Sequence, residues 1–310
     1  MTISGFTVCR NAEQLYYPVK ESILSALPIV DEFVAVVGRG HRSDRTLELL
    51  RSIESPKLKI IETDWDTDKF PNGTVHAQQT DVAKSHCTGD WLLYLQADEV
   101  LHENAEKVIR AACERWFNDS RVEGMLLDYH HFWGDYQHVI DSHGWYKREI
   151  RVIRNHPDIH SYQSAQSFRV IEDFDGLSYR QKEGTRKLRV AKIDAAVYHY
   201  GWVRPPQTMA LKMKELDAIH SHQQAAYPQE FDYGDLSRLA SFKGSHPQVM
   251  HERMASMHWS DCLRHDHEPV VGRNKVKHER WKYRFMSWVE RSLLNGRELG
   301  TYKNYQLIHE

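Results

Sequence analysis

The chain has 310 residues, 41% of them hydrophobic, which is enough apolar material for a sizeable core. Its formal net charge of −2 excludes a general attraction to nucleic acid or to membranes, so any basic surface must be local. No apolar run reaches the roughly 20 residues that a transmembrane helix requires.

Two features of the sequence bear on its compartment. The first residues, MTISGFTVCRNAE, lack the charged-then-apolar layout of a signal peptide. The four cysteines are scattered without a zinc-type spacing, which fits a reducing compartment. We therefore expect a cytoplasmic protein without a nucleic-acid partner.

The first 120 residues or so alternate strand-like and helix-like segments. Short apolar runs predict strands at residues 3–9, 32–37, 58–62 and 91–95. Apolar residues with helical spacing predict helices at residues 12–27, 44–53, 74–86 and 102–117. Strands that are apolar on both faces and separated by helices predict a parallel sheet that is covered on both sides.

The pattern changes beyond this point. Further strands are expected at residues 122–129, 149–154, 168–171 and 195–200. From residue 205 the chain reads as mostly helical and polar, beginning with a helix over residues 207–222. We therefore expect an α/β, Rossmann-like mixed sheet with helices on both faces over residues 1–205, and a mostly helical C-terminal region over residues 206–310.

Polar motifs follow three of the predicted strands. The first strand ends at Cys9-Arg10-Asn11, the second in VVGRGHRSDRT at residues 36–46, and the fourth in Gln96-Ala97-Asp98-Glu99. Ligands of open α/β sheets bind beyond such strand ends. The glycines permit a tight turn, and the helix that follows can hold an anion. Neither a P-loop nor a dinucleotide fingerprint is present, and Gly-Arg-Gly alone indicates a plain turn.

In this order, the motifs resemble those of the family-two, GT-A-fold glycosyltransferases. VVGRGHRSDRT stands where the family usually has a pattern such as VVDSGSTDGT, and is one residue longer. The QADE segment stands where the family has a DxD-like motif, and HYGWVRPP resembles the end of the catalytic domain in bacterial members. The resemblance covers residues 1–205. It implies an inverting, metal-assisted transfer from a UDP- or GDP-type sugar donor to a glycan or lipid-linked acceptor, as in cell-surface polysaccharide biosynthesis.

The resemblance also implies a metal site. Asp98 corresponds to the last Asp of the motif and would hold Mg²⁺ or Mn²⁺ on the donor diphosphate, whose charge the ion neutralises. Gln96 replaces the first Asp and, with Ala97, is expected beside the donor. His199 corresponds to a late His that completes metal coordination in many GT-A enzymes. A strand end that packs the aromatic rings of Tyr198-His199-Tyr200 is the alternative.

Further residues are candidates for nucleotide contacts. Arg10, Arg39 and Arg42 lie near predicted strand ends, where they could meet the diphosphate, with exposed turn arginines as the alternative. Asn11, at the end of the first strand, is a further candidate. Gly38 stands where the family has an Asp that contacts the nucleotide. Asp66, which follows the third strand, is the candidate that would replace this contact, with an ordinary loop carboxylate as the alternative.

The catalytic base is the least defined part of this prediction. Inverting transfer needs a carboxylate that deprotonates the acceptor hydroxyl. In relatives it often follows a strand like residues 149–154, and Asp158 is the one carboxylate in the segment after it, NHPDIHSYQSAQSF. Glu99 and Asp135 are rivals. If the base is missing, the chain is a catalytically impaired binding or scaffold protein. A sugar-phosphate nucleotidyltransferase is disfavoured because FTVCRNAE lacks a Gly-rich loop that ends in Arg and Lys.

Residues 273–291, RNKVKHERWKYRFMSWVER, form a basic and aromatic segment. It holds seven Lys or Arg and two Glu, hence a net charge of +5. In a helix, Trp281, Phe285, Trp288 and Val289 would share one face. This pattern fits a helix on an anionic bilayer at the inner membrane face. A helix packed on the domain with its cations in water is the alternative. The twenty histidines match no helix-borne HExxH motif, which leaves a zinc hydrolase as a minor alternative.

Overall fold

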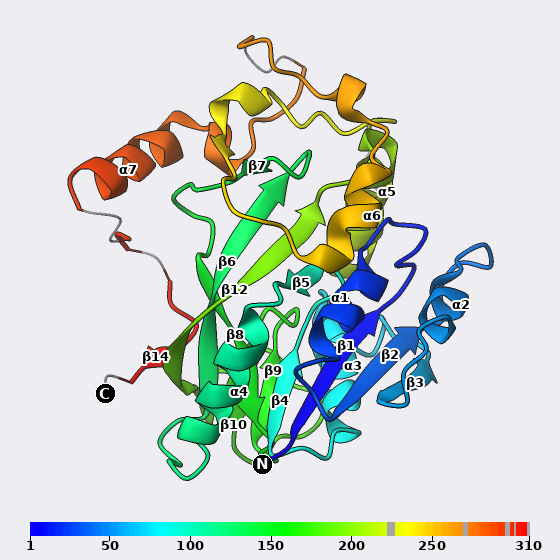
Figure 1. Cartoon of the computed structure of the whole chain (residues 1–310), viewed down its shortest axis with the longest axis vertical. Helices are drawn as coiled ribbons and strands as arrows, with labels where there is room; N and C mark the ends of the chain where they lie inside the picture. Colours follow the sequence, from blue (N-terminus) through cyan, green and yellow to red (C-terminus); the bar gives the residue numbers. More distant parts are fainter. Residues whose placement is uncertain (222–226, 269–271, 295–297, 301, 309–310) are drawn as a thin grey trace.

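A computed structural model describes residues 1–221, 227–268, 272–294, 298–300 and 302–308 (Figure 1). Within these ranges an 11-stranded mixed sheet forms the centre of the protein. One half of it is parallel, in the order β3-β2-β1-β4. These strands are β1 (Ile3–Cys9), β2 (Glu32–Gly38), β3 (Leu58–Thr63) and β4 (Trp91–Tyr94), close to their predicted positions.

The other half of the sheet is mixed. β8 (Arg148–Arg154) pairs antiparallel with both β4 and β6 (Gly124–Trp133). The long strand β12 (Arg189–Trp202) runs parallel to β6 and antiparallel to the short β5 (Glu99–Leu101). Small strands at the margins are β7 (His138–Val139), β13 (Ala240–Ser241) and β14 (Gln306–Leu307). A second, three-stranded sheet comprises β9 (Ile159–Tyr162), β10 (Ser167–Ile171) and β11 (Thr185–Lys187).

Alternate residues of the parallel strands enter two separate cores. On one face, α1 (Val19–Ala26), α2 (Thr46–Arg51) and α4 (Ala105–Arg115) pack against side chains that include Phe33 and Trp91. On the other, α3 (Thr74–Ser85) and the small sheet pack against side chains that include Phe6 and Tyr94. The period-two alternation of a strand thus gives two buried faces. The predicted fold class, a mixed sheet covered on both sides, is confirmed.

Two helices begin three or more residues later than predicted. α1 begins at Val19 rather than at Ala12, because the preceding residues form turns in which Asn11 and Tyr16 have positive φ angles of 53° and 59°. α4 begins at Ala105 rather than at His102, because β5 ends at Leu101 and the next three residues form the turn into the helix. A three-residue strand is too short to produce a periodic signal in the sequence.

The C-terminal region packs on the same sheet. It consists of α5 (Pro206–Ser221), α6 (His251–Ala255), α7 (Trp281–Ser292) and four short 3₁₀ segments joined by irregular chain. The buried Trp259 donates a hydrogen bond from Nε1 to the carbonyl of Gly134, at 2.9 Å. The last residue of the predicted helix 207–222 lies outside the described residues, and the boundary at residue 205 stays a prediction. None of the described helices has the length and apolarity to cross a membrane.

Candidate active site

A cleft of about 630 Å³ opens at the carboxyl ends of β1 and β4. The turns after these strands form its floor, and the end of β12, the helix α5 and the segment before β8 form its walls. This is the edge of the sheet at which ligands of α/β proteins bind. The cleft therefore lies where the strand-end motifs predict it.

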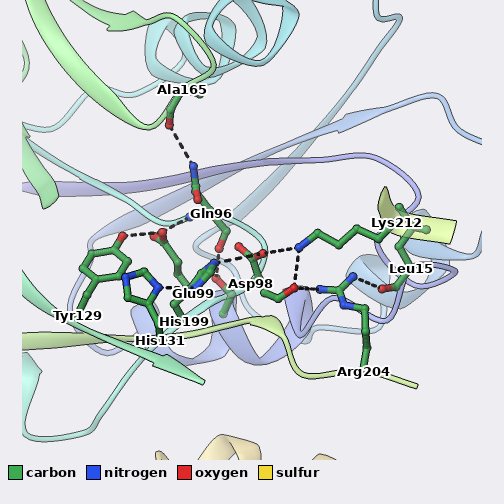
Figure 2. A network of polar contacts seen from close by, with 12 residues as sticks. Leu15, Gln96, Asp98, Glu99, Tyr129, His131, Ala165, His199, Arg204 and Lys212 are labelled. Carbon is green, nitrogen blue, oxygen red and sulfur yellow. Dashed lines mark hydrogen bonds and ion pairs between the residues drawn. The ribbon is translucent and has the colours of Figure 1, made fainter. Parts of the chain in front are cut away.

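Asp98 lies in the turn between β4 and β5 and lines this cleft (Figure 2). Its Oδ2 lies 3.6 Å from Nε2 of His199 and 3.4 Å from Nζ of Lys212. Burial by itself would raise the pKa of this carboxyl. The nearby His199, Lys212 and Arg204 outweigh burial and hold the pKa of Asp98 well below its usual range. Asp98 is therefore ionised.

A second histidine fixes the ring of His199. The Nδ1 atoms of His199 and His131 lie 3.0 Å apart, and Nε2 of His131 lies 2.7 Å from the carbonyl oxygen of Tyr146. Burial lowers the pKa of His131 to about 3, so this ring is neutral. Because a carbonyl can only accept, His131 carries its proton on Nε2, and Nδ1 of His199 donates to Nδ1 of His131.

This tautomer leaves Nε2 of His199 directed at Asp98. The 3.6 Å between Nε2 and Oδ2 is longer than a hydrogen bond. It is wide enough for a cation at roughly 2.1 Å from each atom. The structure thus brings together the two predicted metal ligands, Asp98 and His199, through a strand end and a distant β-strand.

Lys212 and Arg204 place two buried cations next to Asp98. Nζ of Lys212 donates to the carbonyl of Gly201 at 2.7 Å. Nζ of Lys212 and the guanidinium of Arg204 lie 4.9 and 4.4 Å from the ring centre of Tyr17. Burial, together with Arg204, lowers the pKa of Lys212 to about 7, although Asp98 opposes this shift. The sequence analysis identified neither cation. Lys212 lies in the polar helix α5 and Arg204 in the VRPP segment, and neither local sequence indicates that its charge is buried.

Positive charge exceeds negative charge in this cleft. Asp98 is the one carboxylate among the described residues that line it, whereas Arg10, Lys212 and Lys277 line it too. Arg204 is fully buried beside it. A partly enclosed site with this balance attracts an anion such as a diphosphate.

Glu99, the other carboxylate of the motif, is a structural residue. It is fully buried, and its two oxygens accept from Nε and Nη2 of Arg151, both at 2.7 Å. They also accept from Oη of Tyr129 at 2.6 Å and from the backbone N–H of Gln96 at 3.1 Å. Both oxygens are thereby occupied, contrary to the expectation that Glu99 is a rival base. Instead, Glu99 fixes the turn that carries Asp98.

Three other predicted carboxylates lie away from the cleft. β8 runs antiparallel to β4, with Arg154 opposite Trp91, so the chain after β8 emerges at the edge opposite the cleft. Asp158 lies there, which corrects the expectation that it follows a strand end at the site. Asp135 and Asp66 accept hydrogen bonds from backbone N–H groups of the turns that follow them. The structure brings none of the three to Asp98.

The residues predicted to contact the nucleotide divide into two groups. Gln96 and Ala97 line the cleft, and the amide of Gln96 donates to the carbonyl of Ala165 at 3.1 Å. Asn11 is buried and accepts from the backbone N–H of His41 at 2.8 Å, which holds the loop after β2. Arg39 is exposed and is not among the cleft residues.

Trp65, which follows β3, packs its indole ring against Gly38 at the end of β2. The sequence analysis did not assign it a role. A Cβ at Gly38 would lie 2.2 Å from Nε1 of Trp65, so a larger residue does not fit there without a shift of the indole. The guanidinium of Arg10 lies 5.7 Å from the Trp65 ring centre, and the ring of His76 meets it edge-on at 5.0 Å. Within the described ranges, Nε1 of Trp65 and Nε2 of His76 are buried and have no hydrogen-bond partner. Both residues line the cleft with other parts of their rings.

No protein-family model and no curated protein matches the chain. Among solved structures, S. aureus TarS is 14% identical, with a TM-score of 0.39 over 72% of this chain and 41% of that chain. The mannosyltransferase PcManGT from Pyrobaculum calidifontis is 19% identical, with a TM-score of 0.30 over 40% and 34%. A nucleotidyl transferase from Methanothermobacter thermautotroptrophicus is 15% identical, with a TM-score of 0.29 over 49% and 70%. The chain thus spans less than half the length of TarS.

We expect Arg151→Met to lower the free energy of unfolding by about 3–5 kcal/mol, because it leaves Glu99 buried without its cation. Urea denaturation measures this loss. Arg121→Met removes a guanidinium that pairs with Asp119 at the surface and should leave stability unchanged. The double variant Glu99→Gln/Arg151→Met should be more stable than Arg151→Met. Equal stability of Arg151→Met and the unmodified protein would contradict the structural role of this pair.

Proposed function

We propose that the chain is a family-two, GT-A-type glycosyltransferase that binds the diphosphate of a nucleotide-sugar donor beside Asp98. One observation carries the proposal: the buried carboxylate of Asp98, at the end of β4, lies beside two buried basic side chains, Lys212 and Arg204. A carboxylate that only balanced a charge would need one cation. The surplus of cations suits a ligand that brings further negative charge.

A divalent cation fits between Asp98 and His199. Carboxylate oxygen and imidazole nitrogen are both ligands of Mn²⁺, and carboxylate is a ligand of Mg²⁺. The described residues contain no group of three His, Cys, Asp or Glu that could hold a metal alone. The donor phosphates and water would therefore complete the coordination, as is common for Mg²⁺ at phosphate sites. When bound, the ion would neutralise charge on the leaving diphosphate.

The remaining residues of the site orient the His199 ring, add positive charge for the donor phosphates and contact the nucleobase. His131 holds the His199 ring with Nε2 toward Asp98. Lys212, fixed by the carbonyl of Gly201, adds a positive charge on the side of Asp98 next to α5. On the other side of the cleft, the partly exposed Trp65 indole offers a stacking surface to a nucleobase.

The acceptor side of the proposal rests on the opposite wall of the cleft. Trp145 and Trp202 line it and offer flat, apolar surfaces to sugar rings of a glycan or glycolipid acceptor. Inverting transfer requires a base. Asp98 is the one carboxylate among the described cleft residues, and this favours a second candidate function, a nucleotide-binding or glycan-binding scaffold without turnover.

Binding of UDP and GDP, measured by calorimetry with and without Mn²⁺, tests the site. We expect Mn²⁺ to tighten nucleotide binding about tenfold or more, about 1.4 kcal/mol, and Asp98→Asn to abolish this effect. Asp66→Asn is the matched control, because Asp66 only caps an exposed turn, and should behave like the unmodified protein. If the unmodified protein bound neither nucleotide, the transferase proposal would fail. Binding without turnover of any sugar donor would favour the scaffold.

A second variant distinguishes contacts with the nucleobase from contacts with the phosphates. Trp65→Ala should weaken UDP or GDP binding about tenfold, because stacking on an aromatic ring contributes about 1–3 kcal/mol per base. The affinity for inorganic pyrophosphate should stay unchanged, since the phosphates bind beside Asp98 and Lys212. Equal losses for both ligands in the same titration would show that Trp65 does not contact the base.

A further inference from the structure

Helix α7 turns its aromatic side chains toward solvent. Trp281, Phe285 and Trp288 are 79%, 54% and 53% exposed, and Leu293 just beyond the helix is 65% exposed. The rings of Phe285 and Trp288 stack with centroids 6.1 Å apart. Residues with this spacing form one stripe along a helix, which we call the aromatic stripe (Trp281, Phe285, Trp288). In this arrangement the aromatic side chains of α7, rather than its polar face, are exposed.

Polar contacts fix the orientation of this helix. Ser287 and Glu290, on the opposite face, are buried. Ser287 Oγ accepts from the backbone N–H of His143, and Glu290 Oε1 lies against Nδ1 of His143, both at 2.8 Å. Glu290 also accepts from the backbone N–H of Leu299 at 2.8 Å. Because these bonds attach the polar face of α7 to the domain, the aromatic stripe on the other face is exposed to solvent.

The charges of residues 273–291 are also divided between the protein side and the solvent side. Glu279 is paired with Arg273, with both of its oxygens 2.8 Å from the guanidinium, and Glu290 is buried against His143. Six cations of the segment are exposed: Lys275, Lys277, Arg280, Lys282, Arg284 and Arg291. At 100° per residue, Arg284 and Arg291 flank one side of the aromatic stripe and Lys282 flanks the other. The outward surface of α7 is aromatic and positively charged.

We propose that α7 docks the protein on an anionic lipid bilayer. Aromatic rings favour the headgroup level of a membrane, and Lys and Arg beside them meet the lipid phosphates. A helix with an aromatic face flanked by cations lies in the plane of such an interface. Figure 1 shows α7 at the periphery of the molecule, apart from the helices that cover the parallel strands.

The position of α7 links the bilayer to the cleft. Val276 and Lys277, just before the helix, line the cleft, whereas Lys275 and His278 line a groove of about 620 Å³ to which the aromatic stripe itself contributes. Docking through α7 would therefore bring the mouth of the cleft close to the membrane surface. An acceptor carried by a lipid would reach the cleft from there. This consequence for the acceptor rests on the proposed function, whereas the docking itself does not.

Two rival occupants of the aromatic stripe are a soluble glycan in the adjoining groove and a second copy of the chain. A neutral glycan gains little from six exposed cations. A second copy would need an acidic surface in register with these cations. The groove along the stripe also carries the carboxylates Asp141 and Glu268, but the exposed charges of α7 itself are all positive. Charge complementarity therefore favours the anionic bilayer.

Sedimentation of the full chain with vesicles tests the proposal. We expect binding to phosphatidylcholine vesicles that contain phosphatidylglycerol, little binding to phosphatidylcholine alone, and weakening at high salt. Trp281→Ser/Trp288→Ser and Arg284→Gln/Arg291→Gln should each reduce binding by tenfold or more. Leu177→Ser, which removes a 52% exposed side chain between β10 and β11, should bind like the unmodified protein. Melting temperatures of these variants should be unchanged, because the altered side chains are exposed.

Three outcomes would overturn the docking proposal. The first is that the unmodified protein ignores vesicles with phosphatidylglycerol, and the second is that the aromatic-stripe variant binds them equally well. The third is that light scattering finds a dimer that Trp281→Ser/Trp288→Ser dissociates, with no vesicle binding in either form. Nucleotide binding by the same variant is the internal reference: if it persists while vesicle binding is lost, the two sites are separate. Vesicle binding by a protein that binds no nucleotide would overturn the proposed function alone.

Discussion

A buried ion pair between Arg151 and Glu99 determines how the end of β4 can be used. Removing two charges from water is costly, and such a pair is stable only when its remaining hydrogen-bond sites are filled. Here two guanidinium N–H groups, the hydroxyl of Tyr129 and the backbone of Gln96 fill the carboxylate. These bonds attach the turn between β4 and β5 to Arg151 of β8. Asp98, one residue earlier, is left on the cleft side of that turn.

Two adjacent carboxylates thus have opposite tasks because their surroundings differ. Glu99 is neutralised inside the protein by a neighbour on β8, and nothing from outside can reach it. Asp98 faces a cleft in which the basic side chains of Lys212 and Arg204 more than balance its charge. The excess positive charge is available to a ligand, and this is the physical basis for proposing a diphosphate. The aromatic and basic surface of α7, which we propose docks on a bilayer, follows directly after Val276 and Lys277 of the same cleft.

Parts of the structure that depend on local sequence patterns could be predicted, whereas parts that depend on contacts between distant segments could not. The four parallel strands and the strand-end position of Asp98 depend on local apolar runs, so the sequence places them well. Asp158 was misplaced because its role assumed a strand end at the cleft, whereas the antiparallel pairing of β8 sends it to the opposite edge. Lys212 and Trp65 could not be identified, since burial of a cation and an unpartnered indole N–H arise only from contacts between distant segments. The orientation of α7 depends likewise on bonds from His143.

The central claim is that Asp98 and His199 bind a metal-bound diphosphate next to Lys212. The most direct measurement is a crystal structure of the protein with UDP or GDP and Mn²⁺, with anomalous scattering used to locate the ion. We predict a manganese peak between Oδ2 of Asp98 and Nε2 of His199, with phosphate oxygens near Lys212 and the base against Trp65. A manganese peak or a nucleotide bound elsewhere, with this cleft free of both at saturating ligand, would contradict the account.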